Sequence, residues 1–188
     1  VEVLYNLTNL TDITFREHFN QPIDSINNLI NLRKIIFGND FDQPIDFSNN
    51  LTNLIEIGFG DNFNQPIDSL MNLKNLREIY FGKYFDQSIE ALNNLTELTS
   101  IQFGDYFDKD VSALLPLSLT HLTFGSYFNQ DISKLPQTIT HLTLGENFNL
   151  ENNIPSNIKY LKLDCSNSHT INSLPNSVAE LELDYYFN

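Results

Sequence analysis

The chain has 188 residues, 41% of them hydrophobic, and a formal net charge of −14 at pH 7 from 24 acidic and ten basic side chains. Because this negative field repels phosphate groups, the charge argues against nucleic acid and an anionic membrane as partners; it either favours a basic partner or simply keeps the protein soluble. The single cysteine, Cys165, excludes a disulfide within the chain, and no apolar run is long enough to span a membrane.

A five-residue phrase returns at a nearly fixed interval along the chain. It starts as FNQPI at Phe19 and recurs, unchanged at Phe63 and in variant form at the others, at six further phenylalanines: Phe41, Phe63, Phe85, Phe107, Phe128 and Phe148. The spacing is 22 residues four times, then 21, then 20. A period of this length is typical of a solenoid, in which each unit packs only on its neighbours. We therefore expect residues 1–188 to form a single solenoid of about nine rungs, as part of a longer chain, with 22-residue repeats to about residue 110 and 19–21-residue repeats after it.

The pattern L-x-x-I-x-F-G in each early repeat predicts one short β-strand. Leu76, Ile79, Phe81 and Gly82 are one example. Ile79 and Phe81 lie two residues apart, so they point to the same side of a strand, toward the core. We expect the strands of successive repeats to pair in parallel, about 4.8 Å apart. The glycine is expected to permit a sharp turn off the strand.

The segment after FNQPI shows a period of three, as in the third repeat at Ile67, Leu70, Leu73, Leu76 and Ile79. This period predicts a 3₁₀-like or irregular helical return path on the back of the solenoid. Asn64 and Pro66 suit its N-cap and first turn. From Leu115 on, the unit changes to LPLSLTHLTFG and LPQTITHLTLG, which is one or two residues shorter and places Pro before the strand. The return path should shorten accordingly.

The phenylalanines indicate where the core lies, because fourteen of the fifteen fall in two repeat columns and Phe47 is the exception. We predict that Phe63 is fully inside, stacked between Phe41 and Phe85, since each repeat can bury its ring only against adjacent repeats. Phe47 is expected on the back, where serine stands in the flanking repeats. Its replacement by Ala is therefore predicted to cost much less than that of Phe63.

These motifs resemble those of a known family. The L-x-x-L-x-L pattern is similar to the leucine-rich repeats. The phrases FNQPI and LPQTITHLTLGENFN look like the FNIP repeats, a subgroup abundant in social amoebae and giant DNA viruses. The resemblance covers nearly the whole chain, except that the copy near Asn167 lacks the Phe and the Gly.

The resemblance implies a leucine-rich-repeat-like solenoid with one short parallel β-strand per 20–22-residue repeat and 3₁₀ or irregular helical return segments on the back. It also implies that the strand face is the usual binding surface. Members of the family often join such repeats to an F-box or another interaction domain, and no F-box is visible in this sequence.

Outward positions of stacked rungs form surface columns, and one column after the Phe-Gly turn brings three tyrosines onto consecutive rungs beside Tyr80. Tyrosine offers a large, stiff ring with a polar tip, which is why it concentrates at protein interfaces. The alternative is that these rings only pack over the turn glycine of the next rung. The predicted partner-binding residues are Tyr80, Tyr84, Tyr106, Tyr127, Glu56, Glu78, Gln102 and His121.

Metal sites receive weaker support. His121 and His141 occupy one column on adjacent rungs, near enough to share a metal, but no third ligand is evident. Asp86 and Asp108 are neighbours in a column of Asn and Asp that runs from Asn20 to Asn149, and close carboxylates can bind calcium. A ladder that accepts backbone N–H bonds explains every position of that column at once. We therefore expect no metal and no cofactor.

The sequence predicts a non-enzymatic protein-interaction module, with no catalytic arrangement of Ser, His or Cys165. It could be the substrate-recognition part of a larger protein. The alternative is a structural or self-assembling repeat protein of a filament or particle, because both ends present unfinished rungs that could associate. The lone cysteine favours the cytoplasm, or the host cytoplasm if the protein is viral, over secretion. We discount the N-x-S/T sequons, which come largely from the repeated phrase NLT, at Asn6, Asn9, Asn50 and Asn94.

Overall fold

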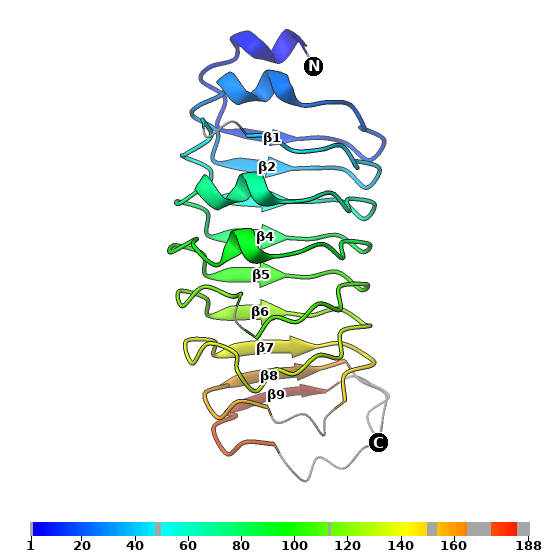
Figure 1. Cartoon of the computed structure of the whole chain (residues 1–188), viewed down its shortest axis with the longest axis vertical. Coiled ribbons are helices and arrows are strands. Elements are labelled where there is room, and N and C mark those ends of the chain that lie inside the picture. The colour runs from blue at the N-terminus through cyan, green and yellow to red at the C-terminus, as the bar shows by residue number, and fades with distance from the viewer. Residues whose placement is uncertain (1, 48–49, 113, 150–153, 165–173, 184–188) are drawn as a thin grey trace.

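The computed structural model describes residues 2–47, 50–112, 114–149, 154–164 and 174–183. Within them, nine short strands form one sheet in chain order, and each strand pairs in parallel with the next. Figure 1 shows the strands stacked along the long axis of the molecule. The strands are β1 (Asp12–Thr14), β2 (Lys34–Ile36), β3 (Glu56–Gly58), β4 (Glu78–Tyr80), β5 (Ser100–Gln102), β6 (His121–Thr123), β7 (His141–Leu144), β8 (Tyr160–Leu163) and β9 (Glu180–Leu183).

The strand register places equal repeat positions side by side. Ile35 pairs with Ile57, Ile57 with Ile79, and Ile79 with Ile101, and all four side chains are buried. Since only the central residue of each three-residue strand points inward here, the residues on either side of it face outward. The predicted solenoid with one parallel strand per repeat is confirmed, and its outward residues form the continuous surface called here the strand face.

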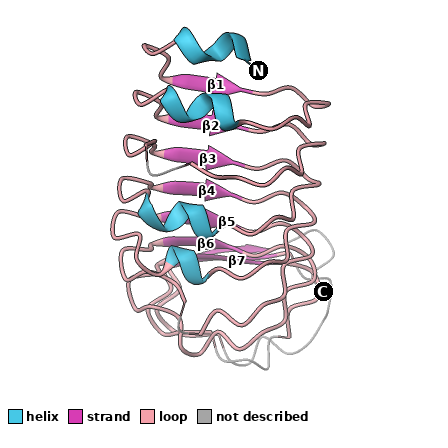
Figure 2. Cartoon of the chain, turned by 45° about the horizontal axis from the view of Figure 1, so that its top comes forward, coloured by secondary structure: helices cyan, strands magenta, loops and turns pink. Residues whose placement is uncertain are grey.

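The return segments contain short 3₁₀ helices in the first half of the chain: η1 (Glu2–Asn6), η2 (Asp24–Asn28), η3 (Asp68–Asn72) and η4 (Glu90–Leu92). Figure 2 shows them one above another along one side of the stack. Each of the last three buries one side chain completely, namely Ile26, Leu70 and Leu92. The period of three therefore produced the predicted helical return path.

The later rungs return by tighter turns, and their described residues contain no helix after η4. The Leu-Pro phrase closes a turn in which the backbone N–H of Leu119 donates to the carbonyl of Pro116 at 3.1 Å. Ile139 and Pro136 repeat this bond one rung later, also at 3.1 Å. The shorter repeats thus replace a helical turn by a proline turn, as their length predicted.

The core is built on two continuous columns of stacked phenylalanine rings. Phe63 has no exposed surface, and its ring centroid lies 6.0 Å from that of Phe41 and 6.2 Å from that of Phe85. Within its own rung the ring lies 4.1 Å from that of Phe59, which belongs to the second column. The predicted position of Phe63 is confirmed. The ring of Phe63 is thus covered by the rungs above and below and by its own rung.

The prediction for Phe47 is wrong. Its side chain is fully buried, like that of Phe63. In the flanking rungs the first inward residue after the isoleucine comes three positions later, as Leu70 does after Ile67, whereas Phe47 turns inward only two positions after Ile45. This shorter step fits an extended path better than a 3₁₀ turn, and the described residues between β2 and β3 contain no helix. Phe47 therefore fills the place that Leu70 fills one rung later.

The predicted N-caps are also wrong, because η3 begins after Ile67, which makes no side-chain capping bond. Asn64 instead bonds to the next rung: its Oδ1 accepts the backbone N–H of Asp86 at 2.9 Å and Nε2 of Gln87 at 3.0 Å. The same backbone bond joins every successive Asn or Asp of the column from Asn20 to Asn149. We call this column the Asx ladder. The expectation of a ladder that accepts backbone N–H groups is confirmed, but it links rungs and does not cap helices.

The turn glycines are required for a reason other than the one predicted. None of the chain's glycines has a φ in the left-handed range, so the turn itself does not need glycine. A Cβ at Gly60 would instead collide with the backbone of Gly38 and Asn39 in the preceding rung. The same collision recurs at the glycine of each later turn, as at Gly82 against Gly60. Glycine lets consecutive turns stack backbone on backbone.

Candidate functional site

The tyrosines predicted to line up after the Phe-Gly turn form a stack of exposed rings, called here the Tyr strip: Tyr84, Tyr106 and Tyr127. Their centroids lie 5.1 Å and 4.8 Å apart, with interplanar angles of 33° and 35°. The exposed fractions are 45%, 43% and 50%. Because the ring faces cover one another, the edges and hydroxyl groups remain for a partner.

The backbone holds the Tyr strip at the spacing of the rungs. The N–H of Tyr106 donates to the carbonyl of Lys83 at 3.0 Å, and the N–H of Tyr127 donates to the carbonyl of Asp105 at 2.9 Å. Asp105 also accepts Oγ of Ser126 at 3.1 Å, and Lys83 Nζ lies 5.7 Å from the ring centre of Tyr84. The backbone of the strip is therefore tied by hydrogen bonds to the rung before it.

Tyr80 belongs to the strand face and makes no ring contact with the Tyr strip. Its hydroxyl donates to the Glu78 carboxylate at 2.5 Å. This bond, with a smaller contribution from burial, raises the pKa of Tyr80 to about 12. The phenol therefore stays protonated at physiological pH and fixes the carboxylate. The predicted cluster is thus divided between the strand face and the turn.

The other predicted residues differ in their surroundings. Glu56 accepts Nζ of Lys34 at 2.7 Å, and this bond raises the pKa of Lys34. Gln102 is exposed at the end of β5. Gly58, which lies between Ile36 and Tyr80 in the outward column, is unexpectedly buried because the Ile36 side chain leans over it. The sequence analysis missed this apolar spot, although an isoleucine beside an outward glycine was a visible signal.

His121 stacks on His141, with centroids 4.1 Å apart and an interplanar angle of 15°. The Nδ1 atoms lie 2.8 Å and 3.0 Å from the hydroxyl oxygens of Thr120 and Thr140. Burial, and then the charge of His141, lower the pKa of His121, against a smaller raising effect of Glu78. The stacked imidazoles therefore resemble a packed pair more than converging metal ligands.

The carboxylates of the Asx ladder that were considered for calcium are already engaged by other groups. Asp86 pairs with Lys109, whose Nζ lies 2.9 Å from its Oδ2. Asp108 accepts the backbone N–H of Asn129 at 2.9 Å and Nε2 of Gln130 at 3.0 Å. Across the part of the chain that the structure describes, no group of three or more His, Cys, Asp or Glu side chains could hold a metal. Cys165 and Asn167 lie outside that part.

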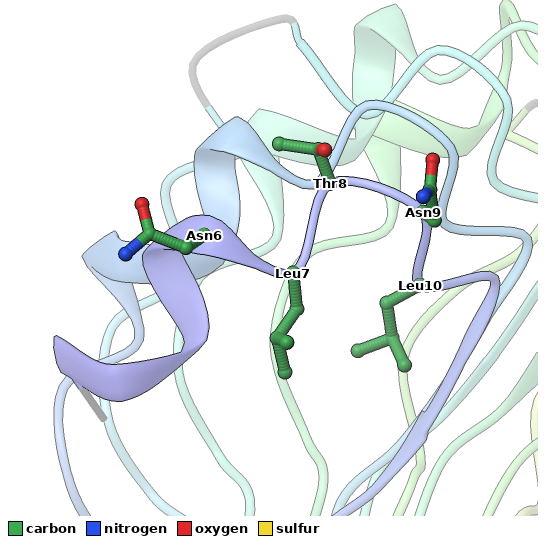
Figure 3. A pocket seen from close by; sticks show the side chains of 5 residues that line it. All are labelled: Asn6, Leu7, Thr8, Asn9 and Leu10. Carbon is green, nitrogen blue, oxygen red and sulfur yellow. The ribbon is translucent and has the colours of Figure 1, made fainter.

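Among the hollows that lie away from the predicted residues, two bear on binding. One, of about 360 Å³, opens at the N-terminal rung among Asn6, Leu7, Thr8, Asn9 and Leu10. Figure 3 shows the side chains of Leu7 and Leu10 projecting the same way. Leu7 is 48% exposed, whereas the equivalent Leu29 of the next rung is fully buried.

The second hollow, of about 220 Å³, lies where the chain enters strands β2 to β4. We call it the arginine hollow: Arg33, Asn53, Ile55, Asn75 and Arg77. The sequence predictions do not include this hollow, because they concern the columns within and after the strands and not the column immediately before them. Two arginines separated by two repeats were the available signal.

No helix in the described ranges has the length and apolar character needed to cross a bilayer. The FNIP Repeat family matches the chain at residues 112–147 and again at 147–186. A comparison with curated proteins gives no match.

Two solved structures show the same architecture. CroV588, a circular LRR protein from a giant virus, is similar over 96% of this chain, with 31% identity and a TM-score of 0.61. An internalin, InlF of Listeria monocytogenes, is similar over 96% of this chain, with 22% identity and a TM-score of 0.65, which shows the fold alone. The chain spans 34% of the first protein and 55% of the second. Together with the strand register and the Phe columns, these likenesses show that the chain is a leucine-rich-repeat-like solenoid, in which residues 112–186 match the FNIP Repeat family.

Proposed function

We propose that the protein is a non-enzymatic interaction module that binds a protein partner with the strand face and the Tyr strip. It would serve as a recognition part of a larger protein in the cytoplasm. The observation that carries the proposal is the Tyr strip, in which three rings that are 43–50% exposed stack on consecutive rungs. The core does not depend on these rings, because Phe41 and Phe63 are fully buried on rungs that carry Asp40 and Asn62 at the tyrosine position.

Preorganisation supports this use of the Tyr strip. Binding normally costs the ordering of flexible side chains, roughly 0.5–1.5 kcal/mol for each one immobilised. Rings that are already stacked on a hydrogen-bonded turn avoid much of that cost. Stiff aromatic residues of this kind dominate the energy of protein interfaces.

The charge of the strand face supports a basic partner. Glu56 and Glu78 pair across β3 and β4, while Lys34 neutralises only one of them directly. A lysine or arginine of the partner would find the Glu78 carboxylate already oriented by Tyr80. The chain's net charge of −14 would speed the approach of such a partner at low salt.

The test is selection of binding peptides from a random display library, followed by hydrogen exchange to locate the protected residues. We expect peptides enriched in Lys and Arg that protect β3 to β5 and the turns of the Tyr strip. A variant with Tyr84, Tyr106 and Tyr127 changed to Ser should lose binding. The matched control is Tyr5→Ser, which removes a ring that is 58% exposed outside the strip. Equal binding by the triple variant and the control would refute the assigned surface.

A further inference from the structure

The arginine hollow brings two arginines into one column at the start of strands β2 to β4. Arg33 and Arg77 are exposed residues that immediately precede β2 and β4, and Ile55 holds the same position before β3. The parallel register places the three residues in one column, so two strand spacings, about 10 Å, separate the two arginine backbones. The hollow of about 220 Å³ opens between them.

The two guanidinium groups are available to a ligand. Arg33 makes no ion pair with any described residue. Arg77 approaches only Glu97, at 3.8 Å, with both side chains more than half exposed, and such exposed pairs contribute little.

The floor of the hollow is fixed by amide side chains. Nδ2 of Asn53 donates to the carbonyl of Ile30 at 2.9 Å, and Nδ2 of Asn75 donates to the carbonyl of Thr52 at 2.8 Å. An amide nitrogen carries two N–H donors, so each asparagine keeps one more for a ligand. Asn53 and Asn75 therefore add donors to those of the arginines.

The donors suit carboxylates on a peptide better than one phosphate. Phosphate sites usually gather several backbone N–H groups, but those of Arg33, Ile55 and Arg77 already donate to the preceding rung at 2.7–2.8 Å. The remaining donors are mainly the N–H groups of the two guanidinium groups. Each guanidinium presents them as a planar fork, and the apolar side chain of Ile55 lies between the two forks. Two acidic residues on an extended segment, spaced by about 7 Å when two positions apart, could each meet one fork while their methylene stems cover Ile55.

We propose that Arg33 and Arg77 clamp two carboxylates of an acidic protein segment that lies along the solenoid axis across the start of β2 to β4. Asn53 and Asn75 orient the carboxylates, and Ile55 contacts their stems. This site is separate from the Tyr strip and from the strand face. A test of acidic-peptide binding at the arginine hollow is therefore independent of a test of the proposed function. A long polyanion such as nucleic acid is disfavoured by the charge of the rest of the chain.

The experiment is an NMR titration at low ionic strength with the capped peptide Gly-Glu-Gly-Glu-Gly. Its neutral counterpart, with Gln for Glu, and inorganic phosphate are the comparison probes. We expect the acidic peptide to shift the guanidinium signals of Arg33 and Arg77 together and the Gln peptide to shift neither. Arg33→Ala and Arg77→Ala should each weaken binding by roughly fivefold to tenfold, because each removes charge-assisted hydrogen bonds.

The matched control is Arg16→Ala, which removes the same charge from an exposed residue outside the hollow. Arg77→Lys keeps the charge but loses the fork, so it should give an intermediate loss. Equal weakening by Arg16→Ala would overturn the proposal, because binding would then follow net charge alone. If phosphate bound as tightly as the acidic peptide, the proposal would be overturned, because the hollow would then be a site for small oxyanions and not for a peptide. Absence of any shift at millimolar peptide would also overturn the proposal.

Discussion

Replacing Gly60 by alanine tests whether the turns stack backbone on backbone. A Cβ at Gly60 would meet the carbonyl of Gly38, and Asn39 Cα would lie 2.6 Å away, whereas real Cβ contacts are essentially never closer than 3.0 Å. Every one of these obstacles is backbone, so no side-chain rotation relieves the collision. The rungs would have to separate, which strains the bond from the N–H of Asn62 to the carbonyl of Asn39, now 2.9 Å. We expect a loss of about 3 kcal/mol, the upper range for overpacking.

Gly58→Ala is the matched control, since it makes the same change two residues earlier in the same rung. Its Cβ would lie 2.8 Å from Cδ1 of Ile36, which is the far end of a flexible side chain, and 3.9 Å from Cβ of Tyr80. Ile36 can rotate away. The smaller backbone entropy of alanine in the unfolded chain then offsets the adjustment, so the net change should be within about 1 kcal/mol.

The assay is urea unfolding of the two variants and the parent protein, followed by circular dichroism. Gly60→Ala should lower the transition midpoint strongly with Gly58→Ala close to the parent. If both variants lost the same stability, or if Gly60→Ala cost less than Gly58→Ala, the close stacking of the turns would not explain the glycine of each repeat.

Three further predictions follow from the core, the Asx ladder and the histidine stack. Phe63→Ala and Phe47→Ala should each cost about 3–5 kcal/mol in denaturant unfolding, because both rings are fully buried; a much smaller cost for Phe47 would contradict its placement in the core. Asn64→Ala should cost about 1 kcal/mol by removing the acceptor of the Asp86 N–H, while Asn64→Asp keeps the acceptor and should cost less, so equal costs would show that this bond is not the cause. NMR titration should give His121 a pKa below 6.5, and it should give His18 a pKa above 6.5 because of the bond from His18 to Asp40. The contribution of neutral His121 to stability is then present above pH 6.5 and is lost as the pH falls below that value. If His18 titrated at a lower pH than His121, the stacking argument would be refuted.

The sequence was sufficient to predict the rungs, their register and the Phe columns, because the period repeats one packing problem along the chain. Ile79 and Phe63 lie where their columns place them. The alignment also predicted correctly that the rings of the Tyr strip occupy adjacent rungs. The identity of the molecule that the Tyr strip binds depends also on the partner, and the sequence of one chain contains no direct information about its partner.

The wrong predictions for the N-caps and the turn glycines share one cause, which is that a contact was read within a rung when it lies between rungs. Asn64 resembles an N-cap in its own repeat, but its acceptor serves Asp86 in the next. The glycine after each strand resembles a conformational need, but the requirement comes from the carbonyl of the rung before, as at Gly60. Phe47 failed for another reason, since its inward step is two residues where the flanking repeats use three.

The Asx ladder is directional, and its direction favours the formation of rungs in order from the N-terminus. Each bond runs from the backbone N–H of a later rung to the side-chain oxygen of an earlier one, as from Asn64 to Asp42 at 3.0 Å. During synthesis the earlier rung emerges from the ribosome first, with its acceptor already in place for the rung that follows. Every new rung then needs contacts only with a neighbour about 20 residues upstream, so folding can keep pace with translation and does not wait for the end of the chain.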